Sequence, residues 1–503
     1  MNSAAKSAFA SDGILKRNSR LPSEILAFLA EKGGRSMILR GNAGTGKTTL
    51  ALQLVEELRA EEKCFYLSTR VSDASLISQF PWLKEKILEG SIALYAAHHA
   101  KEGHGKTTSD ENGSDRVTLE SAGISEISKK HVVLKIGNDL EEVEILRDII
   151  NRYEKEKVLI IIDSIDALAQ RYGKTCADLI TTIQSDFVEC RGVSVLFVLE
   201  SADTQLDYLA DGVVLLKLLD YRMRRIREIE IKKLRGFEIE HTHCLFSLSG
   251  GRVRTFGTAY YFDLSERIKW KSIKDSNGLI SFGIGDMDRL LGGGVEKGSI
   301  VLIEFGYGIP TSVSLAIEKA LVFNFVSQGR GVIWMPMRKA SAETLRNRLS
   351  TSVGEVEFDE HVRIPEKATH INTLQKYLLP IEGESAAHDL SWQNLTYALQ
   401  TSSMPLLSLM GFDTLESIYG DKVVDQLTDH LTAVRKNNAI FVGMAPSSAS
   451  SLRRIADLAT VHIRIDTIRG TVVVYGEKPF TACYGLEFEE KTEGSPISLV
   501  PIV

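Results

Sequence analysis

The sequence is poor in cysteine, and the cysteines it has are not paired. Its 503 residues include only Cys64, Cys176, Cys190, Cys244 and Cys483, without a CxxC pair or zinc-ligand spacing. The histidine pairs at 98–99 and 241–243 also lack cysteine or carboxylate partners at that spacing. An odd, scattered set of cysteines excludes a disulfide framework, and we expect buried, free thiols in a reducing cytoplasm.

Long apolar runs and an excess of positive charge are also missing. No stretch reaches the roughly 18 apolar residues of a membrane-spanning helix, and residues 1–20 lack the apolar core of a secretory signal. Sixty Lys and Arg stand against 66 Asp and Glu, which gives a net charge of −6. The chain therefore has no overall field that attracts nucleic acid or an anionic membrane. We expect a cytoplasmic protein that binds neither.

What is present is the composition of a folded protein, with 44% hydrophobic and 25% charged residues and a length that calls for at least two domains. Strand-like apolar runs alternate with helix-like segments, as in residues 36–67, and this pattern predicts βαβ units with parallel sheets. The polar stretch 101–130 interrupts the pattern and is predicted to be a flexible insertion. We predict an α/β fold with domains at 1–265 and 266–503.

A phosphate-binding motif follows the first strand-like run. Residues 41–48 fit GxxxxGK[ST] and lie between an apolar strand and a segment of helical periodicity. Glycines let backbone amides approach phosphates, the lysine neutralises their charge, and the threonine hydroxyl can hold Mg²⁺. The predicted nucleotide-binding residues are Gly41, Asn42, Ala43, Gly44, Thr45, Gly46, Lys47, Thr48 and Thr49. Among them Thr48 is the first predicted Mg²⁺ ligand.

Asp163 is the second predicted Mg²⁺ ligand. It ends the apolar run 158–162, as expected of a carboxylate at the carboxyl end of a central strand beside the metal. The alternative is that Asp163 or Ser164 caps the helix that follows. The P-loop upstream favours the magnesium role.

Together these motifs resemble the RecA superfamily, most closely its KaiC/RadA-like archaeal branch of tandem-domain ATPases. Residues 282–299 resemble the segment that leads into such a domain, and residues 158–168 resemble its Walker B strand. Within this branch, residues 65–82 most resemble the gas-vesicle protein D (GvpD) family of P-loop regulators. The resemblance implies two tandem RecA-like P-loop NTPase domains with mainly parallel central sheets, and ATP with Mg²⁺ as cofactors.

Residues 229–236 are similar to a KaiC segment with a Lys-x-Arg pair, which maps to Lys233 and Arg235. In that family the pair reaches the γ-phosphate on a neighbouring subunit. The resemblance therefore implies a homo-oligomer with ATP at subunit interfaces. The catalytic residues that it implies are Lys47, Asp163, Lys233 and Arg235, the last two in trans.

The first half departs from that family at the position of its general base. KaiC-like enzymes have a pair of glutamates after the strand that follows the P-loop, whereas this chain has Thr69 and Arg70. Neither accepts a proton as a carboxylate does, and losing a positioned base costs about 10²–10⁴ in rate. We therefore expect slow ATP hydrolysis. Glu200 is the other carboxylate expected to face the nucleotide, with a surface or capping role as the alternative.

The equivalent loop of the second half has lost its phosphate contacts. Phe305, Pro310 and Thr311 replace the first glycine, the last glycine and the lysine, so that an ammonium and an N–H are absent. Asp413 keeps a Walker-B-like place, although a structural capping role is the favoured interpretation there. Residues 478–480 are expected to replace the Lys-x-Arg pair with its arginine gone. We predict a degenerate second domain, a pseudo-ATPase.

An arginine-rich stretch lies before the Lys-x-Arg pair. Residues 221–236 hold seven basic residues against two glutamates, and strand alternation puts Arg225, Arg227 and Ile229 on one face. Within it, residues 221–227 are a candidate equivalent of the arginine-rich regions of the GvpD family. A solvated edge strand and a partner-binding interface both remain open, and nucleic acid is disfavoured because no aromatic residues interleave the arginines.

The sequence favours an ATP-binding regulatory protein that uses nucleotide binding and slow hydrolysis to control a partner protein or its own assembly. One alternative is a RadA/RecA-like DNA-dependent ATPase in recombination or repair, which needs basic DNA-binding loops that a net acidic chain does not advertise. Another is a KaiC-like autokinase with a Ser or Thr acceptor in the insertion or near the second-half loop. Salt-sensitive DNA binding and phosphate transfer to protein distinguish them.

Overall fold

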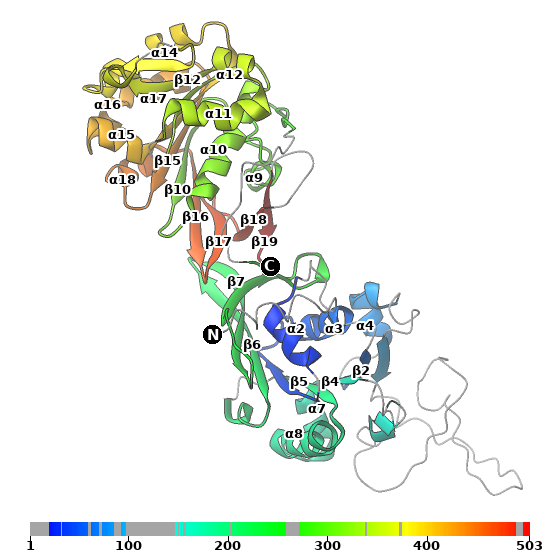
Figure 1. The fold of residues 1–503 in the computed structure, drawn as a ribbon. Helices are drawn as coiled ribbons and strands as arrows, with labels where there is room; N and C mark the ends of the chain where they lie inside the picture. Colours follow the sequence, from blue (N-terminus) through cyan, green and yellow to red (C-terminus); the bar gives the residue numbers. More distant parts are fainter. Residues whose placement is uncertain are drawn as a thin grey trace, which may run out of the picture. The chain divides into compact units, whose positions relative to one another are not determined.

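The computed structural model describes residues 20–31, 33–58, 62–69, 73–84, 92–96, 146–148, 150–151, 153, 157–200, 204–257, 271–337, 340–371, 375–488 and 496–503. The chain divides into two compact units, Met1–Thr255 with Val503 and Phe256–Ile502. The boundary predicted at residue 265 and the insertion predicted at 101–130 lie outside the described residues. Each unit is an α/β unit with a mixed, mostly parallel sheet (Figure 1).

The first unit contains nine described strands in one sheet. They are β1 (Ser36–Arg40), β2 (Glu62–Ser68), β3 (Ile92–Ala96), β4 (Lys157–Asp163), β5 (Ser194–Leu199), β6 (Gly212–Tyr221), β7 (Arg224–Leu234), β8 (His243–Ser247) and β9 (Arg254–Thr255). The described helices are α2 (Ser23–Ala30), α3 (Lys47–Glu57), α4 (Asp73–Gln79), α7 (Ile165–Tyr172) and α8 (Cys176–Ile183), with a π-helical turn at Gln184–Glu189 and 3₁₀ turns at Thr204–Leu206 and Ser249–Gly251.

The central strands β1, β4 and β5 of the first sheet are buried on both faces. Its strand order is β3-β2-β4-β5-β1-β6-β7-β8-β9, parallel from β3 to β6 and antiparallel beyond. Because successive side chains of a strand point to opposite faces, Met37 and Leu39 pack in the core beneath α2 and α3, whereas Ile38 packs in the core beneath α7 and α8. Figure 1 shows these two helical layers. Burial on both faces explains the near-continuous apolar runs of these strands.

The second unit has ten described strands and a longer series of helices. The strands are β10 (Ile300–Phe305), β11 (Arg330–Met335), β12 (Val362–Lys367), β13 (Leu378–Ile381), β14 (Ser403–Gly411), β15 (Ile440–Pro446), β16 (Val461–Ile468), β17 (Thr471–Lys478), β18 (Tyr484–Phe488) and β19 (Ile497–Pro501). The helices are α9 (Gly285–Leu290), α10 (Thr311–Val326), α11 (Ala342–Val353), α12 (Glu355–His361), α13 (Ala386–Asp389), α14 (Trp392–Ala398), α15 (Phe412–Tyr419), α16 (Val423–Gln426), α17 (Thr428–Lys436) and α18 (Leu452–Leu458), with a 3₁₀ turn at Ala368–His370.

The second sheet repeats the strand order of the first. Its order is β13-β12-β11-β14-β15-β10-β16-β17-β18-β19, which is the first order with β13 added at the parallel edge. In the first sheet the antiparallel pairs begin with β6 and β7, and in the second sheet they begin with β16 and β17. The strand that precedes the P-loop, β1, and its counterpart β10 therefore hold the same position in their sheets.

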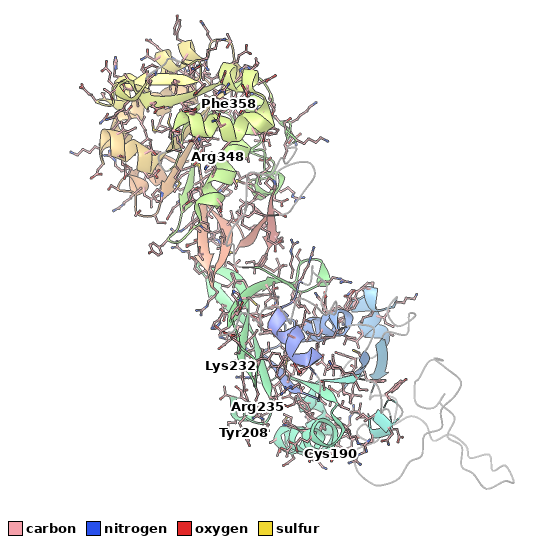
Figure 2. The ribbon with its side chains drawn as sticks, viewed as in Figure 1. Cys190, Tyr208, Lys232, Arg235, Arg348 and Phe358 are labelled. Atoms are coloured by element: carbon pink, nitrogen blue, oxygen red, sulfur yellow. The ribbon has the colours of Figure 1, made fainter. Side chains whose placement is uncertain are left out.

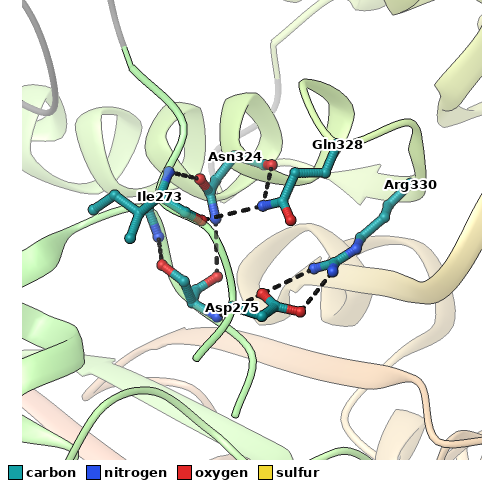
Figure 3. Close-up of polar contacts among 7 residues, drawn as sticks. Ile273, Asp275, Asn324, Gln328 and Arg330 are labelled. Atoms are coloured by element: carbon teal, nitrogen blue, oxygen red, sulfur yellow. Dashed lines mark hydrogen bonds and ion pairs between the residues drawn. The ribbon is translucent and has the colours of Figure 1, made fainter. Parts of the chain in front are cut away.

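Polar side chains anchor the start of the second unit to α10. Asn324 accepts a hydrogen bond from the Ile273 N–H at 2.7 Å, and Gln328 donates to the Ile273 carbonyl at 3.2 Å (Figure 3). Arg330 makes a two-pronged ion pair with Asp275, with its shorter N–O distance 2.5 Å. These contacts place the Gly-rich segment that follows residue 282 beside the sheet.

Two expectations from the sequence concern the surface. None of the five cysteines, all of which lie in described parts of the chain, forms a disulfide. Cys190 is exposed and Cys176 and Cys244 are partly exposed, which corrects the prediction that the thiols are buried. No helix within the described parts of the chain is both long and apolar enough to span a membrane.

Candidate nucleotide-binding site

The predicted P-loop joins β1 to α3, in the centre of the first sheet. Gly44 and Gly46 have φ values of 76° and 102°, which side chains with a Cβ rarely adopt. At Gly41 an added Cβ would collide with the carbonyl oxygen of Leu216. The Thr45 hydroxyl donates to the Asn42 carbonyl at 2.9 Å and closes the turn. The loop conformation therefore depends on its glycines.

Lys47 is the first residue of α3, and its side chain is buried in the loop. Its ammonium donates to the carbonyl oxygens of Gly41 and Asn42 at 2.8 and 2.9 Å. The ammonium thus lies across the mouth of the loop, at the amino terminus of a helix. This is where a helix dipole and free N–H groups favour a bound anion.

Asp163, at the end of β4, lies beside the helix that follows the P-loop. Its Oδ2 accepts hydrogen bonds from Thr48 Oγ1 at 2.7 Å and from the Tyr66 hydroxyl at 2.6 Å. Burial raises the pKa of the Asp163 carboxyl above its ordinary value, against the effect of these two hydrogen bonds. Thr48 and Asp163 provide hard oxygen atoms side by side, which is the donor set that Mg²⁺ prefers.

Tyr66 on β2 and Thr69 directly after it, which the sequence did not single out as Asp163 partners, hold the end of β4. The Tyr66 hydroxyl contacts the carboxylate, and burial, with the nearby Asp163 charge, raises the pKa of Tyr66 well above its usual value. Thr69 Oγ1 accepts a hydrogen bond from the Ser164 N–H at 2.8 Å, so this residue links the two strand ends. The pairing of β2 with β4, with Ser68 opposite Asp163, is the signal that brings them together.

Glu200 lies at the end of β5, and Arg70 lies outside the described residues. The Glu200 N–H donates to the Asp166 carboxylate at 2.8 Å. The negative charge of Glu200 also contributes to the raised pKa of Asp163, so the two carboxyls are electrostatic neighbours. The structure therefore places Glu200 on the Asp163 side of the sheet edge.

Lys233 and Arg235 lie elsewhere, against the segment that precedes β6. The Lys233 ammonium donates to the Ala210 carbonyl at 2.6 Å, and Arg235 forms an ion pair with Asp211 at 2.9 Å. The Arg235 side chain remains 61% exposed and lies at the surface with Tyr208 (Figure 2). Within one chain, Lys233 and Arg235 thus contact residues 207–211 and not the P-loop.

The arginine-rich stretch begins at the tip of the β6–β7 hairpin and continues along β7. Arg225 is exposed, Arg227 is half-buried and Ile229 lies in the core, as strand alternation predicts for one face. Behind it, His243 contacts the buried Glu228 at 2.9 Å. The Lys217 ammonium pairs with Glu228 and Glu230, so a cation of the chain itself already balances these carboxylates.

The second-half loop differs in its charge as well as in its sequence. Phe305 is buried at the end of β10, and a Cβ at Gly306 would collide with the Asp466 carboxylate. An acidic group of β16 thus packs against this loop. Arg464 pairs with this carboxylate at 3.4 Å, and with Thr311 at the lysine position the loop offers no lysine ammonium to a phosphate.

Strand register corrects the predicted place of Asp413. In the first unit Asp163 pairs with Val198 on β5, and in the second unit Gly411 pairs with Met444 on the equivalent strand β15. Gly411 therefore holds the strand-end position, whereas Asp413 lies in the first turn of α15. The described structure supports the helix-terminus interpretation of Asp413 over a Walker-B-like one.

Lys478 is the structural counterpart of Lys233. Lys233 pairs with Val213, the second residue of β6, and Lys478 pairs with His462, the second residue of β16. The strand register shifts directly after each of these pairs. Lys478 donates to the Ala456 carbonyl at 2.7 Å, and Lys233 donates to the Ala210 carbonyl. Two residues further, Phe480 takes the place of Arg235 and is exposed.

Comparison with known proteins agrees with this architecture. The family model described as "GvpD gas vesicle protein, P-loop domain" matches residues 25–232, and "GvpD basic region 2" matches residues 269–376. The arginine stripe at 221–227 therefore lies within the P-loop match, not within the matched basic region. A P-loop domain implies nucleotide binding.

Similarity to individual proteins extends over nearly the whole chain. It is 24% identical over 510 residues to Protein GvpD2 of Halobacterium salinarum, which covers 96% of this chain and 97% of the relative. It is 22% identical over 555 residues to Protein GvpD1 of the same organism, with 96% of each covered. The circadian clock oscillator protein KaiC of Prochlorococcus marinus is 25% identical over 350 residues, 66% of this chain and 60% of that protein. With its P-loop, its strand-end aspartate and these matches, the chain belongs to the GvpD P-loop domain family, is homologous to GvpD1 and GvpD2, and is distantly related to KaiC.

Proposed function

We propose that this protein is an ATP-binding regulator of the GvpD type, built from two tandem RecA-like domains of which the second is degenerate. The observation that carries the proposal is the contrast between two equivalent loops. The first has Lys47 across its mouth and Thr48 bonded to Asp163, whereas the second has Thr311 and a packed Asp466 carboxylate. One triphosphate is therefore held per chain, in the first unit.

Residues of the first unit divide the work of binding. Lys47 moves from the loop carbonyls to the β- and γ-phosphates, and the P-loop N–H groups bind phosphate oxygens. Thr48 Oγ1 and Asp163 Oδ2 are the residues that would hold Mg²⁺, which supplies positive charge beside the phosphates when it is bound. With Thr69 at the carboxylate position, the chain itself offers no base there, so hydrolysis is slow.

Nucleotide occupancy then controls a partner protein or the assembly of the chain with copies of itself. Arg235 is exposed and is available to a neighbouring subunit, as expected if ATP lies at an interface with Arg235, and Lys233 beside it, acting in trans. The second unit serves as a scaffold in this proposal.

Calorimetry with Mg²⁺ and ATP tests the binding site. We expect one site per chain in the wild type, no detectable heat with Lys47→Ala, and unchanged binding with Thr311→Ala, which alters the equivalent position of the other unit. Equal loss in both variants, or two equivalent sites per chain, contradicts the proposal.

Native mass measurement across an ATP titration tests the control of assembly. We expect the mass to change with nucleotide, and Arg235→Ala to reduce both that change and ATP turnover. If Arg235→Ala leaves turnover and assembly as in the wild type, the trans role is wrong.

A further inference from the structure

Arg227, on β7, contacts the backbone of the P-loop. Its Nη1 donates to the carbonyl oxygen of Gly44 at 2.9 Å and to that of Thr45 at 3.1 Å. Both acceptors are main-chain atoms, so the contact reports on the path of the loop itself. A single guanidinium nitrogen thus holds two successive peptide units.

The two contacts define which way these peptides face. In a trans peptide the C=O and N–H point in opposite directions. Because the carbonyls of Gly44 and Thr45 face Arg227, the N–H groups of Thr45 and Gly46 face away from it, and the Thr45 N–H donates to the Asn42 carbonyl at 3.3 Å. Amides oriented in this way are what a phosphate-binding nest requires.

The sheet fixes the position from which Arg227 acts. Its backbone pairs with Leu218 on β6, and Ile229, two residues along the same face, is fully buried in the core with Leu39 and Leu216. The arginine therefore extends from a rigid strand, while the loop it contacts is rich in glycine. The restraint passes from the sheet to the loop.

Positive charge is concentrated at the same place. Burial lowers the pKa of the Arg227 guanidinium, and the neighbouring Arg225 lowers it further. The Arg227 guanidinium and the Lys47 ammonium both contact P-loop carbonyls, and their positive charge favours an anion in the loop.

We propose that Arg227 is a positioning residue for nucleotide binding, which holds the peptides of Gly44 and Thr45 so that the N–H groups that follow face the phosphates. The inference deepens the proposed function and rests on it. Through the hydrogen bonds of Arg227, the β6–β7 hairpin directly contacts the P-loop.

The test compares Arg227→Ala with Arg225→Ala, which removes the same charge from the same face two residues away. Because a hydrogen bond from a charged group contributes about 1.5–3 kcal/mol, we expect Arg227→Ala to weaken Mg²⁺–ATP binding about 10- to 100-fold. Arg225→Ala is expected to change it by no more than about threefold, as an exposed charge does. Arg227→Lys, which keeps a donor and the charge, should recover part of the loss.

Amide hydrogen exchange in the nucleotide-free protein provides a second readout. We expect the amides of residues 44–47 to exchange at least about tenfold faster in Arg227→Ala, with β1 and β4 protected as in the wild type. Unchanged exchange with unchanged affinity overturns the proposal, and so does an equal affinity loss in Arg225→Ala. If the wild type itself does not bind ATP, the proposed function fails, whereas the exchange measurement still decides the role of Arg227.

Discussion

At the scale of single residues, the first unit is organised around the Asp163 carboxylate. It is partly buried and accepts hydrogen bonds from two hydroxyls, those of Thr48 and Tyr66, on the same oxygen. Burial favours the neutral acid and the hydroxyls favour the carboxylate. Metal binding requires the carboxylate, so its protonation sets a lower limit to the pH range of Mg²⁺-dependent binding.

Tyr66→Phe should narrow that pH range. Mg²⁺-dependent nucleotide affinity is lost as pH falls through the pKa of Asp163, which already lies above its ordinary value. Removing a hydrogen bond that stabilises the carboxylate raises this pKa further, by about one to two pH units if the bond contributes about 1.5–3 kcal/mol. ATP titrations at a series of pH values provide the measurement.

The control for this series is Tyr475→Phe in the second unit. The Tyr475 hydroxyl lies 3.4 Å from an Asp466 carboxylate oxygen, a similar pair away from the P-loop of the first unit. Its removal should leave the pH midpoint unchanged. A Tyr66→Phe midpoint equal to that of the wild type would show that the Tyr66 hydroxyl does not tune Asp163.

At the scale of elements, a lysine has the same task in both units. Lys478 lies against the carboxyl end of α18, where cations stabilise a helix through its free carbonyls. Lys233 meets the turn before β6 in the same register. This shared contact explains why the lysine is present in a unit that lacks the arginine and the P-loop lysine.

Lys233→Met and Lys478→Met should therefore each destabilise the unit that contains it, by about 1 kcal/mol, since each removes a cation from partly exposed carbonyls. Hydrogen exchange of the amides of β6 and β16 measures the two effects separately. Arg235→Ala, whose side chain is largely exposed, serves as the control and should change stability little. A Lys233→Met variant of normal stability that no longer assembles would instead assign Lys233 to the neighbouring subunit alone.

At the scale of the whole molecule, one architecture appears twice with different chemistry at the same place. The strand orders coincide, and the register of β4 with β5 is repeated by β14 with β15. Only the first unit has the P-loop lysine, Lys47, together with the strand-end aspartate, Asp163. A fold can therefore be retained as a scaffold after its site has changed.

Mg²⁺–ATP should protect the two units unequally. A ligand at about 100 times its Kd stabilises the state that binds it by about 2.7 kcal/mol. We expect slower amide exchange in residues 41–48 and none of this protection in residues 305–312. Equal protection of both loops would mean that the second unit also binds nucleotide.

The sequence by itself determined the features that depend on residues close together in the chain, namely the P-loop and the individual strands. The glycine pattern and Lys47 define a loop whose amides come from one short segment, and alternating runs predict the parallel strands. Asp163 could also be predicted from the sequence, because a carboxylate at the carboxyl end of a central strand lies at the sheet edge where the P-loop lies. These features are local, so periodicity and motif spacing are sufficient to find them.

Only the tertiary structure decided which distant residues meet. Tyr66 reaches Asp163, Arg227 reaches the Gly44 carbonyl, and Gly411 takes the strand-end position expected of Asp413, through pairings between strands far apart in the chain. A shift of one residue in strand register turns every side chain to the opposite face, and no local pattern specifies that register. The partners of the site therefore follow from the assembled sheet, whereas its phosphate-binding core follows from the sequence.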